Sequence, residues 1–217
     1  FILGLVIIAV IGPLIAPYPE DALGAVHPER AFMPPNPEHL FGTDEAGRDI
    51  FSRVLFGARI SLWIGVLVIV LTLMIGVPLG VIAGYVGGMV DESIMRVTDM
   101  FLSFPSLLLA LVISAVLGPS LNNSMIAIAL SWWPWYTRLV YSISSSLRNE
   151  AFVQAAEIAG ASPFHIIFRE ILPNCLGPIL TKMTLDAGWV ILIGASLSFV
   201  GLGAQPPTPD LGTMVSD

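Results

Sequence analysis

The sequence predicts an all-α protein that crosses a membrane several times, and two features of its composition carry that prediction. Of its 217 residues, 55% are hydrophobic and only 12% are charged, which is about half the charged fraction of a soluble domain. Several apolar runs also reach the roughly 20 residues that a helix needs to cross a bilayer. We therefore expect a polytopic helical membrane protein with five visible spans.

The first apolar run covers residues 1–16 and is expected to be part of a first membrane helix. Residues 17–58 are polar and rich in proline, and such a backbone would leave carbonyl groups without partners if it faced lipid. We therefore assign residues 17–58 to an external loop. Apolar residues recur at helical spacing from Ile50 to Leu55, which predicts a short amphipathic helix at the end of this loop.

The second span is expected over residues 60–83. Within it, Gly65, Gly76 and Gly80 allow close contact between helices, and Pro78 allows a kink.

Three further spans follow along the chain. A short polar connection over residues 84–99 leads to a third span over residues 100–117, with a kink at Pro105. The fourth and fifth spans are expected over residues 124–147 and 176–203.

The stretch of residues 148–176 interrupts the spans with charge, a helix stop and a helix restart. Gly160 follows good helix formers and is a natural C-terminal breaker. Ser162 and Pro163 then provide a capping hydroxyl and a proline at the first helical position. The pattern predicts two short helices joined by an elbow.

Counting five crossings places residues 84–99 and 148–176 on the same side of the membrane. The short connections of that side hold Arg96, Arg148 and Arg169. The positive-inside rule then places the elbow in the cytoplasm and the loop of residues 17–58 outside.

The chain lacks the common signatures of catalytic and metal sites. It contains no G-x-x-x-x-G-K-[ST] run, so it is not expected to hydrolyse ATP, and no G-x-S-x-G nucleophile motif. His27, His39 and His165 show no paired ligand spacing, and a single cysteine, Cys175, excludes a disulfide within the chain. A net charge of −7 argues against nucleic acid as a partner. We expect no enzyme activity, no cofactor and no metal.

Asp186 permits two interpretations. It lies four residues after Lys182, so it is either the partner in an ion pair near the interface or a functional carboxylate inside the membrane.

The elbow resembles a known signature. Gln154-Ala155-Ala156, Gly160 and Leu172-Pro173 are similar to the E-A-A-x-x-x-G … I-x-L-P pattern of permease subunits of bacterial ABC importers. Gln154 replaces the glutamate of that pattern, and Glu170 stands in place of its isoleucine.

Four other segments resemble the dipeptide/oligopeptide/nickel subfamily of these importers, in its C-type permease. They lie within residues 41–62, 95–99, 104–105 and 201–209, so the resemblance covers nearly the whole chain.

The resemblance implies a type I ABC importer transmembrane domain over residues 59–217, with a sixth span expected after Asp217. It also implies that the elbow is a coupling helix that contacts an ATPase. The coupling residues would be Gln154, Ala155, Ala156, Gly160, Ala161, Ser162, Leu172 and Pro173. The extracytoplasmic family motif would comprise Gly42, Thr43, Asp44, Gly47, Arg48 and Asp49.

The resemblance further implies the partners and the cargo. This chain would be one half of a pore in a bacterial or archaeal plasma membrane, paired with a homologous permease. Two cytoplasmic ATPase subunits and an external solute-binding protein would complete the importer, whose cargo would be di- or oligopeptides. An ion-gradient-driven secondary transporter is the alternative, with Asp186 and Asp99 as its titrating groups, and a membrane scaffold is a third.

Overall fold

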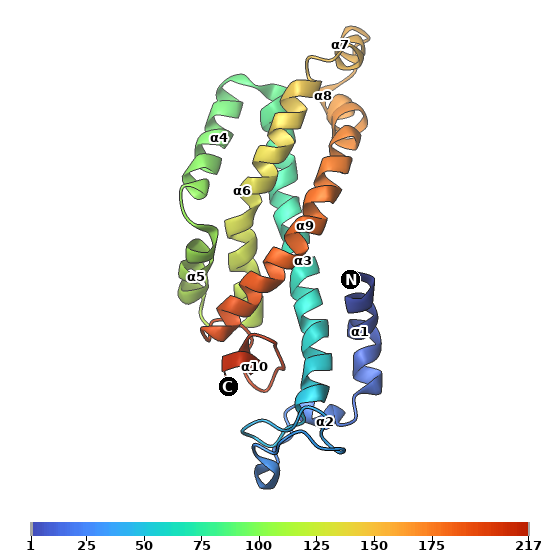
Figure 1. Ribbon diagram of the computed structural model, residues 1–217. Helices are drawn as coiled ribbons and strands as arrows, with labels where there is room; N and C mark the ends of the chain where they lie inside the picture. The colour runs from blue at the N-terminus through green and yellow to red at the C-terminus, as the bar shows by residue number, and fades with distance from the viewer. Residues whose placement is uncertain (1, 217) are drawn as a thin grey trace. The chain divides into compact units, whose positions relative to one another are not determined.

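The computed structural model describes residues 2–216, leaving out the side chains of residues 2, 3 and 5, and these residues form helices joined by turns (Figure 1). The only extended pairing among them is an isolated bridge between Thr43 and Asp49. The expected all-α class is therefore confirmed.

The helical elements follow one another along the chain without any intervening strand between residues 2 and 216. In chain order they are α1 (Ile2–Ile15), α2 (Pro19–Ala22), the 3-10 turn η1 (Pro28–Arg30), α3 (Ile50–Val86), α4 (Gly88–Leu102), α5 (Ser106–Leu117), α6 (Leu121–Leu147), α7 (Ala151–Ile158), α8 (Pro163–His165), the π-helical turn η2 (Ile166–Ile171), α9 (Leu172–Phe199) and α10 (Thr213–Ser216).

Two helical segments within residues 2–216 are long and apolar enough to cross a membrane. They are Ile50–Val86 and Pro163–Phe199, each of 37 residues. Helices α4 and α5 form a third candidate if they are taken as one span bent by 88°. Helix α6, with 27 residues, is long enough to cross a membrane, but it is not among these apolar candidates. Length and composition alone thus support fewer crossings than the five that we expected.

The structure corrects three element boundaries. The amphipathic helix expected before residue 58 is the first part of α3, because no breaker separates Ile50 from the apolar run that follows. The polar connection of residues 84–99 is mostly the helix α4, which begins after a sharp turn at Gly87, where φ is +71°. The kink expected at Pro105 is instead a break, since α4 ends at Leu102 and α5 starts anew at Ser106.

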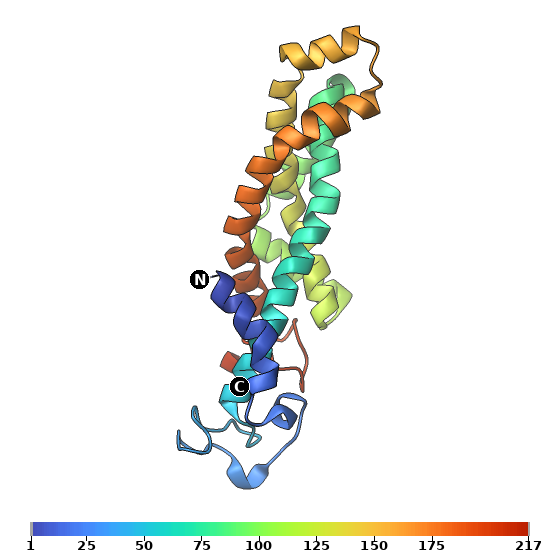
Figure 2. The same ribbon diagram turned by 90° about the vertical axis from the view of Figure 1, so that its right-hand side faces the viewer.

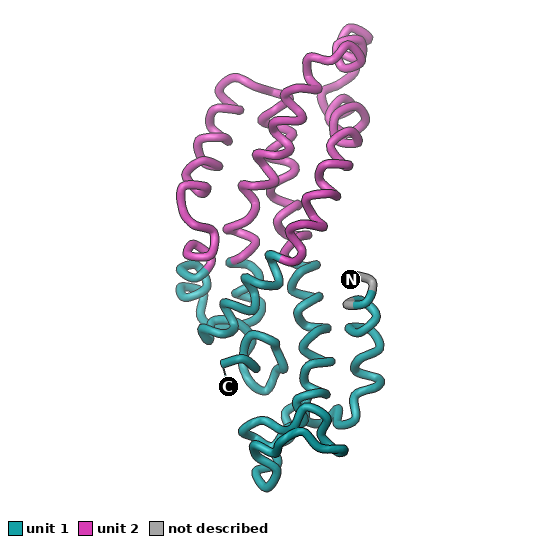
Figure 3. The backbone as a smooth tube through the Cα atoms, in the orientation of Figure 1, with its two compact units in different colours: residues 1–67, 111–127, 189–217 teal, residues 68–110, 128–188 magenta. Residues whose placement is uncertain are grey.

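The chain forms two compact units (Figure 3). Unit 1 comprises residues 1–67, 111–127 and 189–217, and unit 2 comprises residues 68–110 and 128–188.

In unit 1, helix α1 runs beside the first half of α3 (Figures 1 and 2). Gly12 permits this contact, since a Cβ there would lie 3.2 Å from the Cβ of Leu55. Further along α3, a Cβ on Gly65 would lie 3.4 Å from Ile191 of α9. Ser114 donates a hydrogen bond to the carbonyl of Leu202 at 3.3 Å.

In unit 2, three glycines bring the second half of α3 directly onto α6. A Cβ on Gly76, Gly80 or Gly84 would lie 2.6–2.8 Å from α6 atoms, including the carbonyl oxygens of Trp133 and Thr137. Small residues at every fourth position let two helix backbones approach closely. The expectation that Gly76 and Gly80 serve close helix contact is therefore confirmed.

Candidate functional site

The elbow is built from α7, a four-residue turn and the helix that begins at Pro163. Gly160 ends α7 in a left-handed conformation, with φ +80°. Its N–H donates to the carbonyl of Glu157, and the N–H of Ala161 donates to that of Ala156, each at 3.0 Å. These two bonds form a Schellman motif, in which glycine is favoured because it has no Cβ. The predicted helix stop is confirmed.

The predicted restart after the turn is also confirmed. The Ser162 hydroxyl accepts a hydrogen bond from the N–H of His165 at 3.3 Å, and Pro163 occupies the first helical position. The expectation of a second short helix is wrong, however. Residues from Pro163 continue through α8 and η2 into α9 as far as Phe199. Pro173 directly follows the π-helical turn η2, so its missing N–H falls where the regular hydrogen-bond ladder is already interrupted.

The elbow is fixed to the helices beneath it by buried apolar side chains. Val153 of α7 is fully buried, as are Ile166 and Ile171 of η2. They belong to one apolar cluster of unit 2, and its other buried members are Val81, Val140, Cys175 and Ile179. Cys175 is thus a packing residue, as expected for a buried free cysteine.

A polar contact adds to this attachment. The Tyr85 hydroxyl of α3 donates to a carboxylate oxygen of Glu157 at 3.2 Å.

The expected coupling residues divide between two faces of the elbow. Ala156, Ala161 and Leu172 pack partly against the buried cluster. The others lie outside that cluster and are all exposed: Gln154, Ala155, Gly160, Ser162 and Pro173. Gln154, which replaces a glutamate of the signature, donates to the carbonyl of Asn149 at 3.2 Å.

The outer face of the elbow also carries large apolar side chains, which the resemblance did not single out. Ile158 is 89% exposed and Phe164 is 70% exposed. Phe168 packs on Phe164 with ring centroids 4.3 Å apart, and Phe152 is exposed as well. Helical spacing predicts that some of these residues point away from the core, but the sequence does not show which ones.

The family-motif residues before α3 form a buried polar cluster in unit 1. Asp44 pairs with Arg48 at 2.7 Å and with Arg53. Burial raises the pKa of Asp44, but hydrogen bonds from Arg48 and the charges of Arg53 and Arg48 outweigh that effect and hold the pKa below its usual value.

Asp49, Thr43 and the two glycines complete this loop. Asp49 contacts the ring of His39 at 3.0 Å, and its backbone N–H donates to Asp21 at 2.8 Å. A Cβ on Gly47 would lie 1.8 Å from the carbonyl oxygen of His27. The side chain of Thr43 accepts from Met33 at 2.9 Å, and Gly42 has φ +75°. The motif therefore folds the loop on itself, and its residues are too enclosed to form an open site.

Asp186 and Asp99, the groups required by the alternative of an ion-gradient-driven transporter, are both paired. Asp186 lies 3.1 Å from Lys182 and accepts from the indole N–H of Trp132 at 3.0 Å. Asp99 pairs with Arg138. Each carboxylate is thus already engaged by a cation of this chain. The geometry therefore does not favour this alternative.

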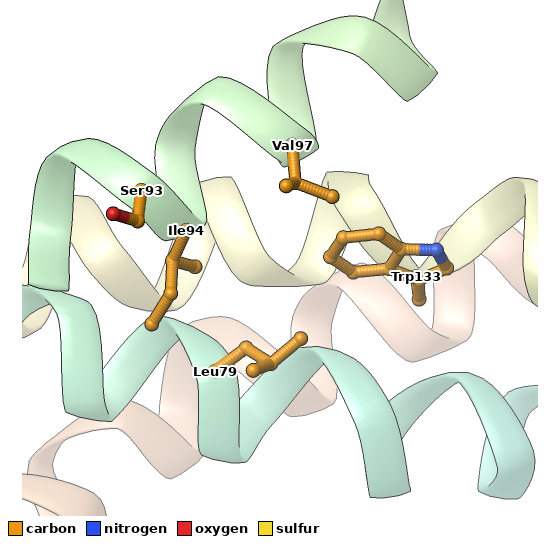
Figure 4. A pocket seen from close by; sticks show the side chains of 5 residues that line it. All are labelled: Leu79, Ser93, Ile94, Val97 and Trp133. Atoms are coloured by element: carbon orange, nitrogen blue, oxygen red, sulfur yellow. The ribbon is translucent and has the colours of Figure 1, made fainter.

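A shallow pocket of about 260 Å³ opens between α3, α4 and α6 in unit 2 (Figure 4). Its lining is Leu79, Ser93, Ile94, Val97 and Trp133. The hydroxyl of Ser93 already donates to the carbonyl of Met89 at 2.7 Å. Because its lining is mostly apolar, this pocket is a packing gap and does not suit a charged solute.

Comparison with known proteins assigns the family. Residues 76–217 match the family described as binding-protein-dependent transport system inner membrane components. The chain belongs to this family. The permease DppC of a dipeptide transport system from Alkalihalophilus pseudofirmus is 46% identical, over 98% of this chain and 69% of the relative. A glutathione transport permease, GsiD of Shigella flexneri, is 45% identical, over 100% of this chain and 71% of the relative.

A solved structure shows the same fold. An inward-facing form of the MetNI methionine ABC transporter superposes with a TM-score of 0.61 at 18% identity, covering 70% of this chain and 76% of the other. The family match and the relatives, together with this shared fold, confirm the identification as an ABC importer permease. This family is a membrane component of transport systems and is not itself an enzyme.

Proposed function

We propose that this chain forms half of the translocation pathway of an ATP-driven peptide importer, and that its elbow docks onto a cytoplasmic ATPase subunit. The observation that carries the docking proposal is the contrast between the two faces of the elbow. Val153 and Ile166 are buried on the inner face, whereas Ile158 and Phe164 are exposed on the outer face. Exposed apolar patches of this kind mark interaction surfaces.

The continuity of the helix supports a coupling role for this surface. Helix residues run without a break from Pro163 at the elbow to Phe199. A displacement of the elbow by the ATPase would thus be passed directly into a membrane helix, as in other two-state helical transporters. The short-connection arginines Arg96, Arg148 and Arg169 support a cytoplasmic position for the elbow.

The partners follow from the family. The importer would contain this chain, a homologous permease, two ATPase subunits and an external solute-binding protein. The cargo proposed is a short peptide, because relatives that are 40–46% identical over nearly the whole chain are named for the transport of dipeptides and glutathione.

The docking proposal is tested by cross-linking within the assembled transporter. A cysteine at exposed Ala155 or at Ile158 should form a disulfide with cysteines placed around the ATPase groove, and ATP should change the yield. A cysteine at Val153, which is fully buried, is the matched control and should give none. If the Ala155 and Ile158 variants give no cross-link in an active complex, the elbow is not the docking surface.

The cargo proposal is tested separately by uptake. Cells that lack other peptide transporters but contain this importer should take up a labelled dipeptide, and deletion of the binding protein should abolish the uptake. Normal ATPase cross-linking together with no uptake of any short peptide would leave the docking proposal standing and overturn the cargo.

A further inference from the structure

Arg59 marks the point where α3 enters its apolar run. The next charged residue along the chain is Asp91, so residues 60–90 carry no charge. Arg59 is exposed, and no hydrogen bond or ion pair joins its guanidinium to any residue that the structure describes. An unpaired arginine at such a boundary is expected to lie at the level of the lipid headgroups.

An apolar groove of about 550 Å³ runs from Arg59 between α3 and α1. On α3 its wall is formed by Trp63 and Val66, which follow Arg59 at helical spacing and are both more than half exposed. On α1 the wall is formed by Val10 and Val6. The groove thus begins at a cation, passes an indole ring and continues along aliphatic side chains only.

A second and smaller pocket, of about 270 Å³, lies on the other side of Arg59. It shares Arg59 and Ile60 with the groove, and its other lining residues lie outside the apolar run, among them Thr208 and the prolines Pro207 and Pro209. Arg59 therefore borders both the apolar groove and a smaller pocket that contains the Thr208 hydroxyl, and both belong to unit 1.

We propose that Arg59 and the α1–α3 groove bind one anionic phospholipid. The headgroup phosphate would pair with the Arg59 guanidinium, the headgroup would extend toward Thr208, and an acyl chain would follow Trp63, Val66 and Val10. Arginine suits phosphate because its planar fork of N–H donors matches phosphate oxygens. An anionic headgroup is preferred over a zwitterionic one, whose ammonium would offset the attraction.

The size of the groove favours a lipid chain over a helix of another protein. A helix about 10 Å wide with a rise of about 5.4 Å per turn fills roughly 400 Å³ per turn, so the groove would take little more than one turn. A partner helix would also leave the Arg59 charge without an anion unless it supplied a carboxylate at that level.

The test is lipid retention by the assembled transporter in nanodiscs of phosphatidylethanolamine and phosphatidylglycerol, read by native mass spectrometry. Wild type should retain phosphatidylglycerol on this chain. Arg59→Gln should weaken that retention about fivefold, the contribution of one arginine at a membrane surface, and Arg59→Lys should fall between. Arg96→Gln, which removes an exposed arginine paired with Glu92, is the control and should change nothing.

Val10→Trp separates a lipid site from a simple anion site, because it fills the groove without altering charge. It should reduce retention of the lipid, and millimolar inorganic phosphate should not displace the lipid from wild type. Displacement by phosphate alone, or unchanged retention in Val10→Trp, would overturn the acyl-chain assignment. Cross-linking of a cysteine at Val10 to the second permease, with no lipid retained, would show that a protein occupies the groove.

Discussion

The backbone N–H of Ala161 donates to the carbonyl oxygen of Ala156 at 3.0 Å, and this bond closes the turn of the elbow. It exists only because Gly160 between them adopts φ +80°. Gly160 is therefore the residue of this turn whose backbone conformation requires glycine.

Gly160→Ala and Gly160→Leu should have similar effects. No atom lies within 4 Å of a Cβ at this position, so the cost is the left-handed backbone, about 1–2 kcal/mol for either side chain. We expect peptide uptake to fall while ATP hydrolysis by the assembled complex continues, measured together in proteoliposomes. Gly177→Ala, in a helical position that is equally open, is the control and should transport normally. Wild-type assembly and uptake in Gly160→Leu would contradict the coupling role.

Two substitutions in α7 should distinguish the attachment of the elbow to the helices beneath it from its docking onto the ATPase. They are Val153→Ala and Ile158→Ser. Val153 is fully buried, so its truncation removes about 2 kcal/mol of apolar burial and should lower amide-exchange protection across residues 151–158. Ile158 is 89% exposed, so Ile158→Ser should leave that protection intact and weaken ATPase binding. The interpretation fails if Ile158→Ser lowers protection as strongly as Val153→Ala.

The loop before α3 should lose stability in acid. The pKa of Asp44 is lower in the folded loop than in the unfolded chain, because Arg48 and Arg53 outweigh the effect of burial. Its contribution is therefore complete above the unfolded pKa of about 3.9 and is lost as the pH falls through that value toward the folded pKa. Thermal unfolding followed from about pH 6 to about pH 3, a window that spans the unfolded pKa, should show this loss in wild type.

Asp44→Asn provides the comparison for that measurement. It should be less stable than wild type near neutral pH, because Arg48 and Arg53 lose their carboxylate, and the difference should shrink as the pH falls. A difference that stays constant with pH would show that the Asp44 charge does not stabilise the loop.

Lys182→Met should destabilise the chain more than Lys182→Met combined with Asp186→Asn. Asp186 is 5% exposed, and removing one partner of a buried ion pair costs about 3–5 kcal/mol because the other charge is left uncompensated. The asparagine removes that charge, and its amide oxygen can still accept from Trp132. Melting temperatures of the three purified proteins test this, and a double variant no more stable than Lys182→Met would contradict it.

The sequence predicts local structure best where that structure depends on residues adjacent along the chain. Gly160 and Ser162–Pro163 have the geometry that their local chemistry predicts. The predicted helix boundaries were wrong at Ile50, where no breaker separates it from the apolar run, and beyond His165, where the helix continues through Pro173.

The loop cluster could not be predicted because its contacts are distant in sequence. Gly47 lies against His27, and Asp49 contacts Asp21. No local sequence pattern predicts such pairs. The difference between the two faces of the elbow could not be predicted either. A signature gives residue types and spacing, but it does not show which side of α7 is buried against Val81 and Val140.

The glycines of α3 determine which parts of unit 2 are able to slide. Gly76, Gly80 and Gly84 leave no layer of side chains between α3 and α6, and Thr137 and Ser144 donate hydrogen bonds across the contact to the backbone of α3 at 3.2 Å. Two backbones locked in this way have no alternative register nearby, since one step along either helix would drive side chains into carbonyl groups. Within unit 2, the second half of α3 and its α6 partner should therefore travel as a single rigid piece during transport.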